Sequence, residues 1–409
     1  MASDVRLNLK NIGLRDVAVA DTKLSLIDGQ EGILIYRGFR IEDLAERSSF
    51  AETAYLLLNG SLPDRGQLEQ FNGELAAARQ VPKLIFDSFR AWPKDADPMD
   101  VLQASVPILA MADPELKVET RDANVRKAIR ILARMASVTA GWHRIRRGLE
   151  PLDPLSFDEQ ASHAANFLWQ FTGRKPDPEM ARALDVSMIL QAEHTFNAST
   201  FACREVVSTR AHIYAGVSAA VGALSGSLHG GANARVMDML LELESQGRSE
   251  GRSEAEQEES VVDWVRQRLE RGEKIMGMGH AVYKTFDPRA IILKGICERL
   301  AKRTGYESRY RLLAGIEEES VKEFERRGRK GLKANVDFYS GLLYSMMGIP
   351  MEFMTPLFAM SLACGWCAHA IEEKFAEAQG KPALYRPQAD YIGFYCGDIG
   401  CIYRPLEER

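Results

Sequence analysis

The chain has 409 residues, which is enough for two or three domains or for one large domain with a smaller partner. Hydrophobic residues make up 46% of the sequence and charged residues 27%, as in globular proteins and unlike disordered chains. The formal net charge of −5 argues against nucleic acid as a partner, because bulk electrostatics would repel it.

The first fifty residues carry the only clear strand pattern. Residues 17–27 and 32–36 are rich in β-prone side chains and flank Asp28-Gly29, a typical hairpin turn. From Ile41 onward, apolar residues recur at helical spacing until Gly60 ends the run. This region therefore predicts a small β element that leads into a helical chain.

Most of the remaining sequence predicts helices separated by Gly and Pro. The clearest of them cover residues 101–112, 123–141, 163–172, 178–192 and 213–224. Residues 246–260 break this pattern, because the sequence Gly-Arg-Ser-Glu occurs twice in a row and Ala255 is their one apolar side chain. We expect a solvated loop or the start of a charged helix there.

Residues 353–371 contain no acidic or basic side chain and are long enough to cross a membrane. They also contain Pro356, His369 and two cysteines, which favours a buried helix in the core or at a subunit interface over a membrane span. No apolar stretch follows the first residues, as it would in a signal peptide. We therefore expect a cytoplasmic protein without a membrane partner.

Six cysteines in a chain of this length do not form a disulfide scaffold. Cys364 and Cys367 have the C-x-x-C spacing, and Cys396 and Cys401 follow downstream, so a metal or redox site is conceivable. No strand precedes the motif, which lies in the apolar segment. The favoured interpretation is buried structural thiols in a reducing compartment.

Three histidines lie in glycine-rich or polar settings that could support chemistry. They are His194 in EHTFNAS, His229 in SLHGGAN and His280 in GMGHAVYK. Arg289 follows Asp287-Pro288, and Asp337 lies in the polar stretch NVDFYSG. Each of these residues alone could belong to a turn or a helix cap. Together, a carboxylate base, neutral imidazole donors and a cation suit enolisation next to a carbonyl group.

In this order, the motifs resemble the citrate synthase family over nearly the whole chain, from Gly13 to Arg409. The matching segments are residues 27–29, 34–38, 41–44, 193–200, 228–233, 279–284, 287–290, 335–337, 340–341 and 386–393. The resemblance implies a mainly α, two-domain helical fold with a small N-terminal β element. It also implies a large domain of residues 1–230 and 349–409, and a small domain of residues 231–348 with a charged insertion near 246–260.

The resemblance implies catalytic roles for three residues. Asp337 would take a proton from the acyl-CoA methyl group, His229 would bind the thioester oxygen, and His280 would donate to the ketone oxygen of a 2-oxo acid.

Other residues would bind the two substrates in a homodimer with a shared active site. The carboxylates of the 2-oxo acid would be held by His194, Arg289 and, from the neighbouring subunit, Arg386. The coenzyme A phosphates would lie near Lys274 and Lys284. Acyl-CoA is then a substrate, and neither a metal nor a permanently bound cofactor is implied.

Leu362 departs from the family pattern. That pattern reads Ser-Arg-x-x-Gly-Trp-x-Ala-His, and its arginine binds a carboxylate of the keto acid. This chain has leucine at that position, between Ser361 and the Gly-Trp pair. We expect oxaloacetate use to be weakened or altered, unless a nearby basic residue replaces the lost contact.

Citrate synthase is therefore the predicted activity, and two alternatives stay close to it. One is 2-methylcitrate synthase acting on propionyl-CoA, and the other is a variant that uses a different 2-oxo acid. An acyl-CoA-binding paralogue without catalysis is an alternative of another class, which predicts decay of the catalytic residues. A metal-dependent hydrolase is least favoured, because the histidines lack tight H-x-x-x-H or H-x-x-E-H spacing.

Overall fold

The chain is mainly helical, as predicted. The computed structural model describes residues 12–14, 17–158, 160–393 and 401–408. Its α-helices are α1 (Ile41–Arg47), α2 (Phe50–Asn59), α3 (Arg65–Ala77), α4 (Lys83–Ala91), α5 (Pro98–Met111), α6 (Arg121–Ile145), α7 (His163–Thr172), α8 (Pro178–Leu190), α9 (Ala198–Ser208), α10 (Ile213–Ser225), α11 (Ala232–Ser249), α12 (Glu254–Glu270), α13 (Pro288–Thr304), α14 (Glu307–Arg326), α15 (Val336–Met346) and α16 (Met354–Lys374). Short 3-10 turns cover Ile12–Leu14, Met351–Phe353 and Leu406–Glu408.

The small β element is an antiparallel sheet with the strand order β1-β2-β3. Its strands are β1 (Ser25–Asp28), β2 (Ile33–Tyr36) and β3 (Phe39–Arg40). The predicted hairpin after Asp28 is confirmed, but the first strand is shorter than expected. Its ladder ends where Ser25 pairs with Tyr36, because the chain turns at Arg37, whose φ is +47°.

The tip of this hairpin touches a later loop of the chain. The backbone N–H of Lys284 donates to the Gly29 carbonyl oxygen over 2.8 Å. A side chain at Gly29 would collide with the Val282 backbone, so the absence of one permits this approach. The hairpin thereby supports the loop that carries His280.

The predicted helices are confirmed, with small shifts at their ends. Residues 163–172 form α7 with the expected bounds. Helix α5 begins earlier than expected, because Asp97 caps it and Pro98 occupies its first turn. The charged stretch near 246–260 contains the end of α11 and the start of α12, which Ser253 and Glu256 stabilise as a capping box. The expectation of a charged helix start is thus correct for its second half.

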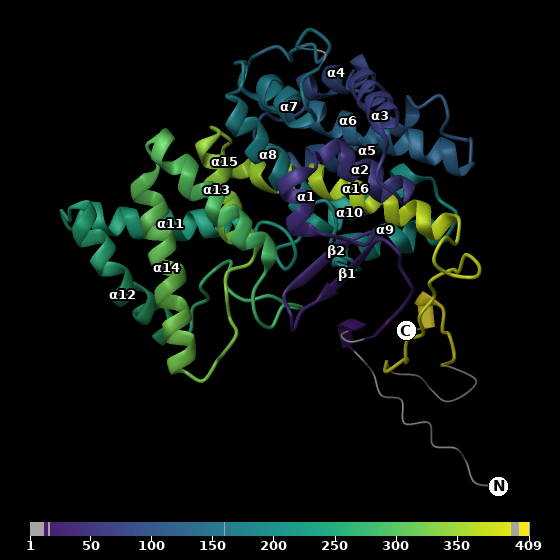
Figure 1. The fold of residues 1–409 in the computed structure, drawn as a ribbon. Coiled ribbons are helices and arrows are strands. Elements are labelled where there is room, and N and C mark those ends of the chain that lie inside the picture. Colours follow the sequence, from purple (N-terminus) through teal and green to yellow (C-terminus); the bar gives the residue numbers. More distant parts are fainter. Residues whose placement is uncertain (1–11, 15–16, 159, 394–400, 409) are drawn as a thin grey trace.

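Helix α16 forms the centre of the core. It packs against α2, α5, α6, α8, α9 and α10 and crosses the middle of these helices in Figure 1. All of its residues except Thr355 and Phe358 are buried. The segment Met351–Lys374 is long and apolar enough to cross a membrane, but 89% of its most apolar window is buried within the fold. The prediction of a buried helix is confirmed.

Cys364 and Cys367 lie inside this helix as buried free thiols, and Cys203 and Cys297 are also buried and free. The favoured interpretation of the C-x-x-C spacing is confirmed for these four residues. It is wrong for Cys401, which is exposed and disulfide-bonded. Cys401 belongs to the C-terminal segment on the surface, where no core shields a thiol. Cys396 lies outside the described residues.

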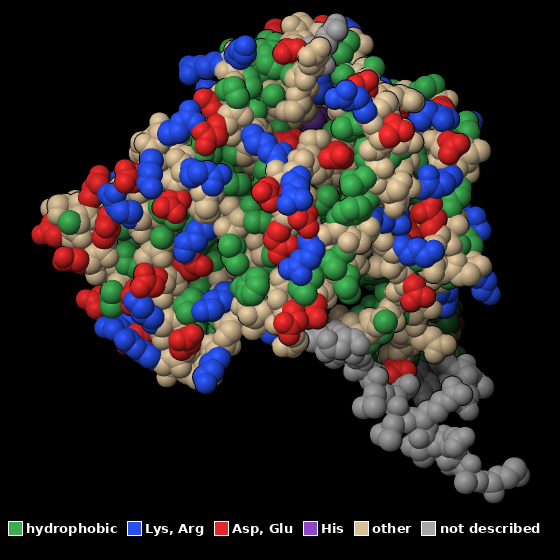
Figure 2. Space-filling model, viewed as in Figure 1, with side chains coloured by type: hydrophobic (Ala, Val, Ile, Leu, Met, Phe, Trp, Pro, Cys, Tyr) green, Lys and Arg blue, Asp and Glu red, His purple; other side chains and the backbone are tan. Residues whose placement is uncertain are grey.

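Helices α11 to α14 gather on one side of the molecule (Figure 1). Acidic and basic side chains are interspersed over the face shown in Figure 2. Within this group of helices, the single side chain of Arg311 forms ion pairs with Glu254, Glu258 and Glu307. The boundaries of a small domain at residues 231 and 348 stay a prediction. Both positions are glycines with positive φ, 72° and 75°, which suits hinges.

We predict opposite effects on stability for alanine at two helical glycines. A Cβ at Gly365 of α16 would lie 2.5 Å from the Ala192 carbonyl oxygen and press on the Glu193 carboxylate. Overpacking of this kind costs about 1–3 kcal/mol, so Gly365→Ala should lower the melting temperature. Gly73 of α3 is the matched control, because a Cβ added there would meet nothing within 4 Å. Gly73→Ala should stabilise by about 0.5–1 kcal/mol. Equal melting temperatures for the two variants would contradict this account of the core.

Candidate active site

A buried ion pair joins the N-terminal ends of α13 and α15, the helices that carry Arg289 and Asp337. The Asp287 carboxylate accepts hydrogen bonds from Arg289 Nε at 2.9 Å and Arg289 Nη2 at 2.8 Å. It also accepts the backbone N–H groups of Arg289 and Val336, at the first turns of α13 and α15. One carboxylate therefore ties the Arg289 side chain to the first turns of both helices.

His280 lies in the loop before α13, and its tautomer is set by the backbone. Its Nδ1 accepts the N–H groups of Val282 at 3.0 Å and Tyr283 at 3.3 Å. In the neutral ring the proton is therefore on Nε2, which becomes a donor. Burial lowers the pKa of His280 to about 4, and the positive charge of Arg289 adds to the effect. His280 is thus a neutral hydrogen-bond donor at neutral pH.

His194 follows α8 and faces His280. The two ring centroids are 5.1 Å apart in an edge-to-face arrangement, and the Tyr283 ring contacts both imidazoles. Nε2 of His194 is buried and has no hydrogen-bond partner among the described residues. Burial, with Arg289 and His280 nearby, holds the pKa of His194 well below its usual range. An unpartnered nitrogen at this place is suited to a polar group of a substrate.

His229 reaches the same region from the loop before α11. Its Nε2 accepts the Ser199 backbone N–H over 3.1 Å, and the Ser199 hydroxyl lies 2.8 Å away. Trp366 of α16 donates to that hydroxyl. Because Nε2 accepts, the proton of the neutral ring is on Nδ1. Burial lowers the pKa of His229, so this ring is also a neutral donor.

Asp337 lies in the first turn of α15, which Asn335 caps by accepting the Asp337 backbone N–H. Burial raises the pKa of the Asp337 carboxyl to about 6, although the positive charges of Arg289 and Arg235 act in the opposite direction. A carboxylate with a raised pKa is a stronger base than an exposed one. Asp337 is therefore suited to take a proton from a weak carbon acid.

The sequence-predicted residues fall into two groups in the structure. Arg289 connects the first group, because its positive charge acts on the pKa of His194, of His280 and of Asp337, and His229 acts on the pKa of His194. Lys284 follows on the same loop and its ammonium donates to the Ala281 carbonyl oxygen. Lys274 and Arg386 are exposed, and no contact between them and the three histidines occurs among the described residues. The roles of all these residues stay predictions.

Two residues of the site were missed at the sequence level. Tyr283 packs against both His194 and His280, and its place in the GHAVYK motif was the available signal. Arg235 lies on α11 and donates to the Gly230 carbonyl oxygen, with a buried Nε that has no partner in the described part of the chain. No local pattern marked Arg235, because its proximity to Asp337 comes from the packing of α11 on α15.

Leu362 lies on α16, one helical turn before Trp366 and two before His369. All three side chains therefore point to the same face of the helix. Trp366 contacts Ser199 and His369 contacts Glu193, so this face looks toward the histidine cluster. Leu362 is 1% exposed. The structure thus places an apolar side chain on the wall behind the candidate site.

Comparison with known proteins gives one consistent family. A family model described as citrate synthase, C-terminal domain, matches residues 13–388. A citrate synthase of Synechocystis is 40% identical over 97% of this chain and 93% of its own, and a 2-methylcitrate synthase of Shewanella oneidensis is 34% identical over 94% and 95%. The solved ternary complex of Thermoplasma acidophilum citrate synthase with carboxymethyl coenzyme A and oxaloacetate is 32% identical, with a TM-score of 0.84 over 97% of this chain and 98% of that one.

We predict that kcat/KM falls at acid pH because Asp337 becomes protonated. Its pKa is raised to about 6, and the ionised form is the base, so kcat/KM should be full above that pH and fall as the pH drops through it. His280, with a pKa near 4, stays neutral over this range. The measurement is kcat/KM for acyl-CoA against pH.

Arg235→Gln provides the directional control. Removing this positive charge raises the pKa of Asp337 further, so the acid limb should move to higher pH. A limb that does not move, or that moves to lower pH, would exclude Asp337 as the titrating group.

Proposed function

The chain belongs to the citrate synthase family and is an enzyme of that type, and we propose that it condenses acetyl-CoA with oxaloacetate to release citrate and coenzyme A. The observation that carries the proposal is the grouping of three neutral histidines with one carboxyl of raised pKa. Enolisation of a thioester needs a base for the methyl proton and an uncharged donor for the oxygen. The site supplies both.

The first step is proton removal from the acetyl methyl group. Asp337 accepts this proton, and Nδ1–H of His229 donates to the thioester oxygen as negative charge develops on it. The Ser199 backbone N–H keeps the His229 ring in the required tautomer. A neutral donor avoids the transfer of a full charge into a dry site, and its fixed orientation needs no reorganisation during the reaction.

The second step is attack of the enol carbon on the ketone carbon of oxaloacetate. Nε2–H of His280 donates a hydrogen bond to the ketone oxygen as negative charge develops on it, while the N–H groups of Val282 and Tyr283 hold Nδ1. The proton that Asp337 took from the methyl group balances the charge of the new hydroxyl, so His280 stays neutral. The carboxylates of the keto acid bind His194 and Nη1 of Arg289, whose planar guanidinium suits them. Water then hydrolyses the citryl thioester in the same site.

We propose a cytoplasmic homodimer in which Arg386 completes the site of the neighbouring subunit. Its exposure on the C-terminal segment, which leaves the guanidinium open to a neighbouring subunit, supports this role. Lys274 and Lys284, both exposed, bind the coenzyme A phosphates. No metal or permanently bound cofactor takes part in the proposed reaction.

The alternatives differ in their substrates. One relative is a 2-methylcitrate synthase, so propionyl-CoA remains an alternative acyl donor. Because Leu362 is apolar and buried, a 2-oxo acid with an apolar or neutral group in place of one carboxylate remains an alternative second substrate. A non-catalytic paralogue is disfavoured, because His229, His280 and Asp337 are all present with suitable surroundings.

The test is thiol release with acetyl-CoA or propionyl-CoA and a series of 2-oxo acids. Asp337→Asn should lower kcat by about 10²–10⁴, because a positioned base is lost, with little change in coenzyme A affinity. Arg386→Ala should also be nearly inactive. Near-full activity of Asp337→Asn on the best substrate pair would refute the mechanism.

Mixing these two variants tests the shared site. Random reassociation gives mixed dimers with one intact site, so about a quarter of wild-type activity should return. Neither variant regains activity if each subunit builds its own site.

Leu362→Arg tests the keto acid. A hydrogen bond to a charged group contributes about 1.5–3 kcal/mol, so the added arginine should raise kcat/KM for oxaloacetate at least several-fold. Leu362→Met is the control, because it keeps an apolar chain of similar volume. If the wild type already uses oxaloacetate with high efficiency and arginine brings no gain, the assignment of this position is wrong.

A further inference from the structure

The backbone next to His194 is in an unfavourable conformation. Thr195 has a φ of +51°, a left-handed value that a β-branched residue rarely adopts. Such a conformation is unfavourable and persists only where the surroundings hold it. Here the Thr195 backbone N–H donates to Glu193 Oε1 over 2.6 Å. The Glu193 carboxylate therefore closes the turn whose middle residue is His194.

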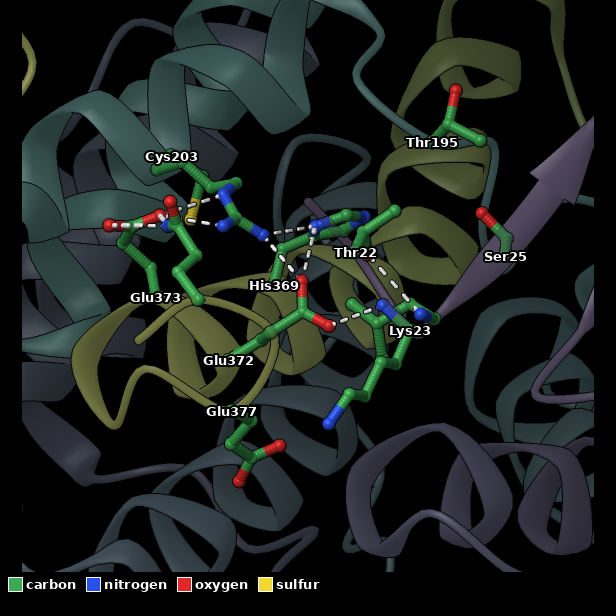
Figure 3. Close-up of polar contacts among 12 residues, drawn as sticks. Thr22, Lys23, Ser25, Thr195, Cys203, His369, Glu372, Glu373 and Glu377 are labelled. Atoms are coloured by element: carbon green, nitrogen blue, oxygen red, sulfur yellow. Dashed lines mark hydrogen bonds and ion pairs between the residues drawn. The ribbon is translucent and has the colours of Figure 1, made fainter. Parts of the chain in front are cut away.

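Glu193 is itself held by a buried hydrogen-bond network. Its Oε1 also accepts the Ser25 hydroxyl at 2.8 Å and His369 Nε2 at 2.9 Å. Nδ1 of His369 faces Nη1 of Arg204 at 3.0 Å, and since arginine can only donate, this nitrogen accepts and Nε2 carries the proton. The side chains of Glu193, Arg204 and His369 are 0% exposed. Figure 3 shows His369 between Ser25 and Thr195 on one side and Glu373 on the other.

The same arginine holds the C-terminal segment. Arg204 donates to Glu372 at 2.7 Å and to Glu373 at 2.6 Å. The Tyr385 hydroxyl donates to Glu373 at 2.6 Å, and the Tyr385 ring stacks on Phe201. The next residue along the chain is Arg386. Arg204 therefore lies between the turn of His194 and the residue that precedes Arg386.

We propose that this network, from Glu193 through His369 and Arg204 to Glu373 and Tyr385, is a positioning device for both outer carboxylate contacts of the keto acid. One end sets His194 in its own site, and the other sets Arg386 for the site of the second subunit. The proposal rests on the proposed function, because it takes both residues as keto-acid contacts. Glu193 and Tyr385 are positioning residues and do not touch substrate.

The physical basis is the rigidity of a hydrogen-bonded network in a dry interior, in which Oε1 of Glu193 accepts three bonds and Oε2 has no partner among the described residues. Hydrogen bonds are stronger at low dielectric, and the loss of a partner leaves a buried polar group in an unfavourable state. The network therefore has one favoured arrangement, which fixes the backbone at each end. Displacement of one end changes the bonds of Arg204 and so affects the other.

The first test separates turn geometry from general stability. Glu193→Ala removes the acceptor for Thr195, and we expect the KM for oxaloacetate to rise about ten-fold or more, with the KM for acetyl-CoA within about two-fold of wild type. Glu193→Gln retains an oxygen acceptor and should stay close to wild type. Thr195→Gly removes the strain of the positive φ, so the double variant Glu193→Ala/Thr195→Gly should recover most of the lost oxaloacetate affinity.

The second test uses Tyr385→Phe, which removes one hydroxyl and keeps the ring on Phe201, so that folding is preserved. We expect the KM for oxaloacetate to rise about three- to ten-fold with kcat little changed, and the dissociation constant of oxaloacetate, measured by calorimetry, to show no further rise when the substitution is added to the nearly inactive Arg386→Ala protein. Tyr55→Phe is the matched control, because Tyr55 packs on Phe71 and is not part of the network.

The outcomes distinguish this inference from the proposed function. A wild type without thiol release refutes the function. An active wild type in which Tyr385→Phe leaves the KM for oxaloacetate unchanged, or acts equally with and without Arg386, overturns the inference. The same holds if Thr195→Gly gives no recovery in a folded Glu193→Ala protein. If Glu193→Ala does not fold, the Tyr385 comparison decides alone.

Discussion

The Asp287 carboxylate is the constraint on which the candidate site depends. It accepts the first backbone N–H groups of α13 and α15 together with two guanidinium nitrogens of Arg289. The start of α15, where Asp337 lies, is thus fixed relative to Arg289. Removal of one member of a buried pair typically costs about 3–5 kcal/mol, because the other charge is left without compensation. The relative position of the Asp337 carboxyl and the Arg289 guanidinium therefore depends on Asp287.

Burial acts on the three histidines and on Asp337 in the direction that favours enolisation. It lowers the pKa of His194, His229 and His280 and raises that of Asp337. The histidines become neutral donors and the carboxyl a stronger base, although the charged side chains of Asp287, Arg289 and Arg235 lie nearby. Backbone N–H groups then select the tautomer, with Nδ1 of His280 and Nε2 of His229 accepting. Two identical side chains consequently present opposite ring nitrogens as donors.

Helix α16 connects this chemistry to the core. One face of it carries Leu362, Trp366 and His369, of which Trp366 supports the Ser199–His229 contact and His369 supports Glu193. A helix that passes the test for a membrane span by length and apolarity is here the wall behind a polar site. Its buried histidine and charged side chains are accordingly held in hydrogen-bond networks, as buried polar groups must be.

The sequence by itself determined the helical fold class, most helix positions and the family, because amphipathic periodicity, caps and ordered motifs are local properties of a chain. His194, His229, His280, Arg289 and Asp337 were found in this way. Tertiary structure alone decided the charges and tautomers of these groups, since they depend on burial and on backbone donors from other segments. It also decided the contacts of Glu193 and Arg204 and the proximity of Arg235 to Asp337, which join residues that lie far apart in the sequence. Local patterns carry no information about such contacts, because packing brings them together only after the chain has folded.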